Sequence, residues 1–318
     1  MSDNLLETRV HTIRYEAEGI LSLELRSVDG TSLPEYSPGS HIDLHLSNGL
    51  IRSYSLFKPS GKEQGYVVGI LRDRQSRGGS AWIHDNLRVG ALLTISAPRN
   101  NFPLAEESAH SVLVAGGIGI TPILCMLSYL TKQSRSVELI YCARSRQEAA
   151  FIQEIEQFNC PITWHFDDEK QAPPDFTLYL NNKPVTSHFY CCGPSAMINS
   201  FEDACEKHGY SNIHVERFSA KPAGEGHELS QGYMVELSRS GKMLTVSAGQ
   251  SLLDVILASG CIVNCSCREG ICGSCEIAVI DGVVDHRDSI LSNSERAANK
   301  TMMVCVSGCK SGKLVLDL

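Results

Sequence analysis

The stretch Cys267-Arg-Glu-Gly-Ile-Cys272-Gly-Ser-Cys275 decides how the C-terminal part of this chain must fold, and Cys305 follows it at a distance. Cys-x4-Cys-x2-Cys with a remote fourth cysteine is the plant-type ligand pattern for a two-iron two-sulfur (2Fe–2S) cluster. Gly270 and Gly273 carry no side chain, so backbone N–H groups can approach the sulfides. The sequence therefore predicts a 2Fe–2S cluster on Cys267, Cys272, Cys275 and Cys305.

Two other uses of cysteine fit this pattern less well. Structural zinc sites usually come as two short Cys-x2-Cys pairs, whereas the first gap here is four residues. A disulfide framework is disfavoured because the chain holds 13 cysteines, an odd number, and opens with no signal-peptide pattern. Cys309 stays open as an alternative fourth ligand, although the spacing favours Cys305. Six others are expected to be small, buried and apolar: Cys125, Cys142, Cys160, Cys205, Cys261 and Cys265.

The composition is that of an ordinary folded protein. The 318 residues leave room for two or three domains, and 42% of them are hydrophobic while 20% are charged. A formal net charge of −8 argues against a nucleic-acid partner, which would need a basic face. The longest apolar stretch, residues 112–127, contains Pro122 and three glycines, so it predicts strand, turn and helix rather than a membrane span. We expect a monomer in the reducing cytoplasm.

The first third of the chain predicts a small antiparallel β-barrel. Residues 41–46 alternate polar and apolar side chains, as a half-buried strand does. Similar runs occur at residues 20–25, 52–57, 66–71 and 92–96, separated by turns such as Pro38-Gly39, Asn48-Gly49 and Ser60-Gly61. We place this domain at residues 1–104.

Strands and helices alternate from residue 105 to residue 218. Apolar strand candidates lie at residues 111–115, 137–141, 162–166, 189–192 and 213–215, with helical stretches at 147–158 and 195–207. This alternation predicts a parallel sheet with crossover helices. The polar stretch 219–231 predicts a linker. Residues 232–318 then hold a hairpin at Ser240-Gly241, a helix at 251–259, the cysteine loop and a second hairpin at Asp281-Gly282.

Two short motifs of the first domain favour a flavin phosphate site. In Arg52-Ser53-Tyr54-Ser55, strand alternation puts Arg52 and Tyr54 on one face, where they could meet a phosphate and an isoalloxazine ring. Taken alone, the motif is also compatible with an ordinary exposed strand. Arg77-Gly78-Gly79-Ser80 directly precedes a helical stretch at residues 81–87, and backbone N–H groups at a helix start bind anions.

Two loops of the second domain predict a nucleotide site. Gly116-Gly117-Ile118-Gly119-Ile120-Thr121-Pro122 has the strand-to-helix context of a dinucleotide loop, although Pro122 stands where the last glycine of GxGxxG would be. Cys192-Gly193-Pro194 ends a later strand, at the edge where open α/β sheets bind ligands.

Over its whole length the chain resembles the phthalate dioxygenase reductase family, to which the vanillate demethylase reductases belong. Six motifs carry the resemblance, in order: RxYS, RGGS, GGIGITP, CGP, Glu216-x-Phe218 and the plant-type cysteine loop. The resemblance implies a multidomain protein with an antiparallel β-barrel flavin domain, an α/β parallel-sheet nucleotide domain and an α+β plant-type ferredoxin domain. It also implies FMN rather than FAD, NADH as donor, and a separate Rieske-type oxygenase as the electron acceptor.

The same resemblance implies roles for individual residues. The residues expected to hold the flavin are Arg52, Tyr54, Ser55, Gly78, Gly79 and Ser80. Those expected to face the nicotinamide cofactor are Gly116, Gly117, Gly119, Thr121, Cys192, Gly193 and Pro194. Glu216 and Phe218 match residues near the flavin, although a surface charge and an interdomain packing residue are the plain alternatives. We expect Thr121, Cys192 and Glu216 to shape hydride transfer.

NADPH stays open as the alternative donor. No acidic residue closes the second strand, where one would bind the 2′-hydroxyl of NADH; Arg144-Ser145-Arg146 follows there and could accept a 2′-phosphate or form a solvated loop. A stand-alone NAD(P)H oxidase or ferric reductase stays open as the alternative function. A redox-sensing module is disfavoured because the chain has no spare length for a regulatory domain.

Overall fold

The computed structural model describes residues 5–60, 65–74, 77–219, 232–291 and 293–318, without the side chains of residues 293 and 294. The chain divides into two compact units, Met1–Phe218 and Ser219–Leu318. All of the linker predicted at residues 219–231 except Ser219 lies outside the described residues. The domain limits at residues 104 and 231 stay predictions.

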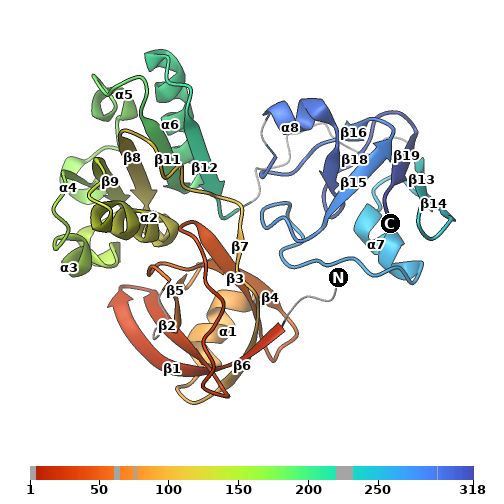
Figure 1. The fold of residues 1–318 in the computed structure, drawn as a ribbon, viewed down its shortest axis with the longest axis horizontal. Helices are drawn as coiled ribbons and strands as arrows, with labels where there is room; N and C mark the ends of the chain where they lie inside the picture. Colours follow the sequence, from red (N-terminus) through yellow and green to blue (C-terminus); the bar gives the residue numbers. More distant parts are fainter. Residues whose placement is uncertain (1–4, 61–64, 75–76, 220–231, 292) are drawn as a thin grey trace. The chain divides into compact units, whose positions relative to one another are not determined.

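An antiparallel sheet forms the first part of the N-terminal unit (Figure 1). Its strands lie in the order β4-β3-β6-β1-β2-β5, with β7 paired to β3. An isolated bridge between Leu56 and Val68 links the two edges, so the sheet closes as the predicted barrel. Apolar side chains from the strands and from α1 (Gly79–Asn86) fill the interior. The strands are β1 Leu5–Ala17, β2 Ile20–Ser27, β3 Ser40–His45, β4 Ile51–Ser55, β5 Tyr66–Leu71, β6 Leu92–Ser96 and β7 Arg99–Asn100.

Two features of this barrel were not expected from the sequence. β1 runs for 13 residues through a stretch that lacks regular apolar alternation. β3 is buried on both faces rather than half-buried. Its polar face is buried because Asp43 accepts hydrogen bonds from Arg99 Nη2 at 2.7 Å and from Ser53 Oγ at 2.6 Å. Buried polar groups that have such hydrogen-bond partners lose little free energy when they leave water.

A parallel sheet forms the second part of the same unit, as predicted. Its order is β10-β9-β8-β11-β12, so the direction of winding reverses between β8 and β11. The strands are β8 Ser111–Gly116, β9 Val137–Ala143, β10 Ile162–Phe166, β11 His188–Gly193 and β12 Ile213–Arg217. The helices are η1 Gly117–Gly119, α2 Ile120–Lys132, η2 Arg146–Glu148, α3 Ile152–Ile155, α4 Asp167–Lys170, α5 Phe176–Tyr179 and α6 Ser195–His208.

The helix predicted at residues 147–158 is wrong in its extent. Only η2 and the single turn α3 form there, and Phe151 between them has φ 63°. Phe151 leaves the helical conformation because its ring packs on Phe57 of the barrel, with centroids 4.5 Å apart. Glu18 N–H also donates to Gln147 O of this segment at 3.0 Å. Contacts with the barrel thus override the local helical pattern.

The C-terminal unit holds a five-stranded sheet in the order β14-β13-β19-β15-β17 and the small pair β16-β18. The helix α7 (Leu252–Ala258) packs its apolar side on the sheet, and Ser251 caps its start. The strands are β13 Tyr233–Leu237, β14 Lys242–Val246, β15 Glu276–Asp281, β16 Val284–Asp285, β17 Thr301–Met303, β18 Gly308–Cys309 and β19 Lys313–Leu316, with α8 at Asn293–Ala298.

One of the two hairpins predicted here is present and the other is not. β13 and β14 pair antiparallel across Ser240-Gly241, as expected. The hairpin predicted at Asp281-Gly282 is wrong, because β15 pairs with β17 and β19 while β16 pairs with β18. The turn signal was correct, but the strand after it joins another partner.

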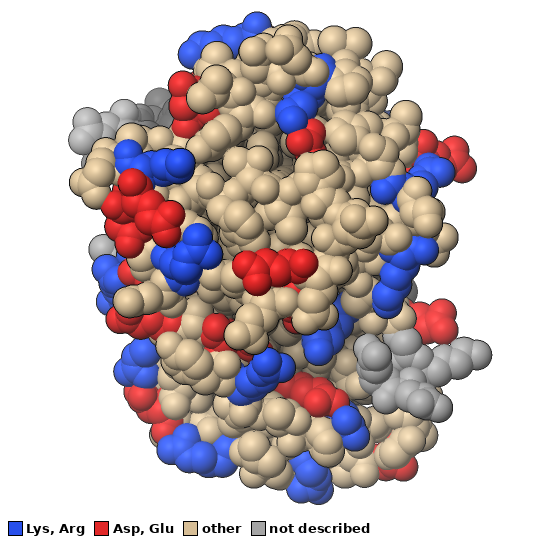
Figure 2. All heavy atoms as spheres, turned by 90° about the vertical axis from the view of Figure 1, so that its left-hand side faces the viewer, with Lys and Arg blue, Asp and Glu red and all other residues tan. Residues whose placement is uncertain are grey.

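Charges of both signs are distributed over the N-terminal unit. The face drawn in Figure 2 carries Lys, Arg, Asp and Glu side chains intermingled, without a continuous basic stripe. Within the part of the chain that the structure describes, no helix combines the length and the apolar character needed to cross a membrane.

Candidate cofactor sites

The four predicted cluster ligands meet in the C-terminal unit as two pairs of thiols. The Cys267 thiol donates to Cys272 and lowers the pKa of that thiol to about 5, and the Cys305 thiol similarly lowers the pKa of Cys275. No group of three His, Cys, Asp or Glu side chains among the described residues is close enough to hold one metal ion. Two pairs are what a two-iron cluster requires, with two cysteines on each iron.

The loop between these cysteines has a backbone suited to wrapping a cluster. Cys267 N–H points at Cys272 Sγ over 3.5 Å, and Glu269 N–H points at Cys267 Sγ over 3.3 Å. Gly270 has φ +67°, and a Cβ there would lie 2.6 Å from Val306 Cγ2. Only glycine fits this position, so the residues present fit a 2Fe–2S cluster. The assignment of individual ligands stays a prediction.

The other cysteines named in the sequence analysis differ in burial. Cys309 belongs to β18, and its Sγ lies 3.5 Å from Ser311 Oγ. Cys125, Cys142 and Cys205 are buried, as expected. The same expectation is wrong for Cys160, Cys261 and Cys265, which are partly exposed because they lie in loops at the surface.

In the barrel, the structure brings Arg52 of β4 onto the start of α1. Arg52 Nη2 donates to Arg77 O at 3.1 Å, and Nη1 donates to Ile51 O at 2.8 Å. A Cβ on Gly79 would come within 2.6 Å of Arg52 Cγ and Nε. The helix starts after Gly78, which has φ 89°. A guanidinium beside backbone N–H groups is an anion site, so these residues fit a flavin phosphate.

The rest of the flavin motif divides between the two faces of β4. Arg52 and Tyr54 lie opposite Leu44 and Ile42 of β3, on the side of the barrel core. Burial raises the pKa of the Tyr54 phenol, which therefore stays protonated. Ser55 lies on the other face, opposite His41. Ser80 Oγ accepts from Asp73 N–H at 3.2 Å.

The predicted nucleotide loops meet where the sheet reverses its winding, between the carboxyl ends of β8 and β11. Open α/β sheets bind their ligands at this position. A Cβ on Gly119 would lie 2.2 Å from Cys192 O, and one on Gly193 would lie 3.1 Å from Gly116 Cα. The two loops therefore touch because they lack side chains there. Gly116 also packs on Met197 and on Pro194, the N-cap of α6, whereas Gly117 has open space in front of it.

Cys192 and Glu216 lie side by side at the ends of β11 and β12. Their strands place them in register, and Cys192 Sγ donates to Glu216 Oε2 over 3.9 Å. Loss of hydration raises the pKa of the Glu216 carboxyl to about 8. Burial also raises the pKa of Cys192, so both groups hold their protons at neutral pH. Phe218, two residues beyond Glu216, is exposed.

Thr121 lies at the contact between the two parts of the N-terminal unit. Its Oγ1 donates to Ile118 O at 3.0 Å, and its Cγ2 lies 2.8 Å from where a Cβ of Gly69 would be. Gly69 belongs to β5 of the barrel. Sequence reasoning did not identify Gly69; its only signal was a glycine inside an apolar strand, which often marks a close approach of another backbone.

The two arginines that follow β9 already have acidic partners. Arg144 Nη1 lies 3.7 Å from Glu148 Oε2, and Arg146 Nε lies 3.4 Å from Glu169 Oε1. The Arg146 guanidinium also covers the Phe166 ring, 4.5 Å from its centroid. Ser145 accepts from Glu148 N–H and starts η2. Pairing reduces the positive charge that this loop offers to a phosphate.

Comparison with known proteins shows what the chain is similar to. Residues 235–310 match the model of the 2Fe-2S iron-sulfur cluster binding domain, and residues 96–215 match that of the dimethylamine monooxygenase subunit DmmA-like N-terminal domain. The chain is 43% identical to phenoxybenzoate dioxygenase subunit beta of Ectopseudomonas oleovorans, over 98% of this chain and 96% of that protein. It is 41% identical to vanillate O-demethylase oxidoreductase of a Pseudomonas species, over 99% and 100%. The solved structure of phthalate dioxygenase reductase superposes with TM-score 0.71 and 35% identity, covering 99% of this chain and 98% of that one.

Proposed function

This chain belongs to the phthalate dioxygenase reductase family of oxygenase reductases, and we propose that it delivers electrons from NADH, through FMN and a 2Fe–2S cluster, to a separate Rieske-type oxygenase. The observation that carries the proposal is the set of four cysteine thiols in two pairs, in a chain whose other unit has a nucleotide-type switch point. When bound, a flavin takes a hydride from nicotinamide and releases its electrons singly to a cluster.

The chain's own residues supply binding and orientation. Arg52 and the start of α1 would hold the flavin phosphate, with Tyr54 on the same face of β4 as Arg52. The loops at Gly116–Thr121 and Cys192–Pro194 hold the nicotinamide cofactor. Thr121, Cys192 and Glu216 shape the position of hydride transfer, and because both Cys192 and Glu216 are protonated they add no charge there. Cys267, Cys272, Cys275 and Cys305 hold the cluster.

For the finer choices we propose FMN over FAD and NADH over NADPH. The ground for FMN is the resemblance of the six motifs to the phthalate dioxygenase reductase family, which implies FMN. The acidic partners of Arg144 and Arg146 support NADH, since a 2′-phosphate would have to compete with two carboxylates for those guanidinium groups. A reducing cytoplasm is the proposed location, because no disulfide links any of the 13 cysteines, all of which lie in described residues.

The acceptor is tested by comparing turnover with different oxidants. The purified chain is given NADH and either the oxygenase component of a vanillate demethylase system, oxygen alone, or a ferric chelate. We expect the oxygenase component to give by far the highest kcat/KM, and Cys272→Ala to abolish that activity while flavin reduction by NADH continues. Equal turnover with oxygen or ferric chelate would instead support a stand-alone oxidase or ferric reductase. Oxygenase-dependent turnover that survives in Cys272→Ala would refute the cluster assignment.

A further inference from the structure

A cavity of about 540 Å³ lies beside the cysteine loop of the C-terminal unit, and neither the cluster nor the nucleotide site uses it. Among the described residues, its lining combines apolar side chains with four nitrogen-bearing ones and includes no carboxylate. The residues are Val283, Val284, His286, Arg296, Ala297, Asn299 and Lys310.

The charged groups of this cavity are arranged with the cations outward. Lys310 is 62% exposed and Arg296 is 28% exposed, whereas the Asp288 side chain is fully buried. Asp288 Oδ2 accepts from the N–H groups of Ile290 and Leu291 at 3.2 Å and 2.8 Å. Asp285 is bound by Arg287 Nε at 2.7 Å. Lys310 Nζ lies 3.8 Å from Asp285 Oδ1 and Arg296 Nη2 lies 3.6 Å from Asp288 Oδ2, but both carboxylates are more buried than their cations. The first charge that a molecule entering the cavity meets is therefore that of Lys310.

His286 and Arg296 still have hydrogen-bonding capacity to offer. The His286 side chain is 9% exposed, and neither of its ring nitrogens makes a hydrogen bond, although Nδ1 lies 3.7 Å from Asp288 Oδ1. Arg296 Nη2 donates to Asp288 O at 2.5 Å, but its Nε has no partner. Buried polar groups without partners cost free energy and are rare in native proteins unless a ligand or water satisfies them. Both residues line the cavity, so an acceptor-bearing ligand inside it would satisfy them.

The cavity is separated from the cysteine loop by one segment of chain, residues 285–289. Ser289 N–H donates to Gly270 O at 2.9 Å, and Asp288 Cα lies 3.0 Å from where a Cβ of Gly270 would be. Arg287 N–H donates to Ser307 Oγ at 3.3 Å, two residues after Cys305. A protein bound at the cavity would therefore lie next to the cluster loop. Electron transfer requires such a short distance between the cluster and its acceptor.

From this arrangement we propose that the cavity is the docking site of the electron-acceptor protein, and that it takes an Asp or Glu side chain of that protein together with an apolar neighbour. The proposal rests on the proposed function, which requires such an acceptor. The cations and His286 recognise the carboxylate, and Val283, 52% exposed, with Ala297 offers the apolar contact. A pocket that receives one anchoring side chain is how many protein interfaces obtain most of their affinity. The cationic rim also steers an acidic partner toward the cluster.

The test uses the full-length protein with its cofactors, whose cluster is first reduced with a stoichiometric amount of dithionite. Two proteins then serve as probe acceptors: an acidic rubredoxin and the basic cytochrome c. Lys310→Glu is expected to lower the second-order rate of rubredoxin reduction about tenfold at low salt and to raise that of cytochrome c, with both effects fading at high salt. Lys313→Glu is the control, because it makes the same charge change on a half-exposed lysine that pairs with Glu236 outside the cavity.

A second pair of variants tests the cavity itself without changing charge. Ala297→Trp would fill the cavity and is expected to lower the rate of rubredoxin reduction about tenfold. Ala298→Trp places the same ring on a neighbouring exposed residue outside the lining and should leave that rate unchanged. Unchanged rubredoxin rates in both Lys310→Glu and Ala297→Trp would overturn the proposal. The proposal would also be overturned if these two variants slowed electron transfer from flavin to cluster within the chain, since the cavity would then bind the chain's own N-terminal unit. Because dithionite reduces the cluster directly, a failure of NADH to reduce it would count against the proposed function alone.

Discussion

At the scale of single residues, Glu216 carries the clearest pH dependence. Its carboxyl has a pKa of about 8 in the folded protein, against 4.5 for the free side chain, because it has lost hydration beside Cys192. The folded state thus binds a proton that the unfolded chain releases at lower pH. The stability linked to this proton is complete below pH 4.5 and is lost as the pH rises toward 8.

We therefore expect the free energy of unfolding of the N-terminal unit to fall, relative to Glu216→Gln, by about 3 kcal/mol between pH 5 and pH 8. Urea unfolding at several pH values, followed for both proteins, measures the difference. The glutamine variant is the control because it keeps the size and polarity but cannot ionise. Parallel stability profiles for the two proteins would contradict a raised pKa at this position.

Arg52 is the residue on which the proposed flavin site depends most. Its guanidinium lies on the start of α1 and supplies the positive charge beside Gly79. Arg52→Ala should weaken flavin binding about tenfold or more, since hydrogen bonds to a charged group contribute about 1.5–3 kcal/mol. Fluorescence titration of the deflavinated protein measures the affinity, and the cluster spectrum should be unchanged. Arg14→Ala, on a 70% exposed side chain, serves as the control. Equal flavin affinity in both variants would exclude Arg52 from the site.

Motif spacing predicted which residues gather, but not what each one touches. The sequence placed Cys192 and Glu216 in one site, and the structure puts them in contact. It did not predict that Gly119 and Gly193 allow the two loops to touch, because packing between distant segments leaves no local pattern. It also missed the acidic partners of Arg144 and Arg146. Glu169 comes from the segment after the next strand, so only the fold brings it near.

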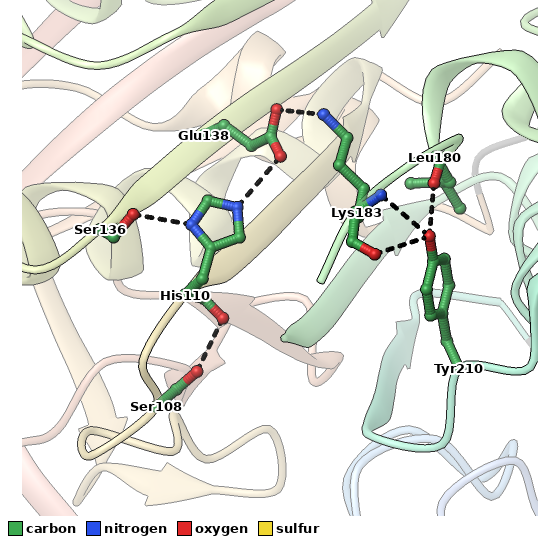
Figure 3. A network of polar contacts seen from close by, with 7 residues as sticks. All are labelled: Ser108, His110, Ser136, Glu138, Leu180, Lys183 and Tyr210. Atoms are coloured by element: carbon green, nitrogen blue, oxygen red, sulfur yellow. Dashed lines mark hydrogen bonds and ion pairs between the residues drawn. The ribbon is translucent and has the colours of Figure 1, made fainter. Parts of the chain in front are cut away.

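At the scale of elements, a polar network ties together the amino edge of the parallel sheet, opposite the nucleotide loops. Figure 3 shows it running from Tyr210 through Lys183 and Glu138 to His110, which also contacts Ser108 and Ser136. The Tyr210 hydroxyl accepts from Lys183 N–H at 3.1 Å and donates to Leu180 O at 2.7 Å. Lys183 Nζ contacts Glu138 at 2.6 Å, and Glu138 contacts His110 Nε2 at 3.1 Å. One hydroxyl thus fixes the loop that leads into β11.

Tyr210→Phe removes that hydroxyl and leaves the Lys183 N–H without its partner. Losing one side of a buried hydrogen bond costs about 1–3 kcal/mol, so the urea midpoint of the N-terminal unit should fall accordingly. Tyr15→Phe makes the same chemical change on a 75% exposed ring and should leave the midpoint where it is. If the two variants have the same urea midpoint, the Tyr210 hydroxyl does not stabilise the amino edge of the sheet.

Strand positions were more predictable than strand partners. The runs at residues 66–71, 92–96 and 162–166 coincide with β5, β6 and β10, because alternation or continuous apolar character is a local signal. The hairpin at Asp281-Gly282 failed because β19, far along the chain, takes the place beside β15. The helix at residues 147–158 failed because Phe151 packs on the barrel. Each error arose where a distant segment decided the local structure.

At the scale of the whole molecule, the chain combines the parts that the proposed electron transfer requires. The N-terminal unit combines the barrel with the nucleotide-type sheet, and the C-terminal unit holds the paired cysteines. Family resemblance predicted this architecture from six motifs, and the fold agrees. The sequence left FMN against FAD to resemblance alone, because both share the phosphate next to the ring that Arg52 would contact.

The most direct test is an anaerobic NADH titration of the purified protein, followed by absorbance, with the released flavin identified by chromatography. We predict FMN, inorganic sulfide, and full reduction of the flavin and the cluster at roughly 1.5 NADH per chain, since a flavin takes two electrons and a cluster takes one. A folded protein that contains no flavin or no sulfide, or whose cluster stays oxidised with excess NADH, would contradict the account.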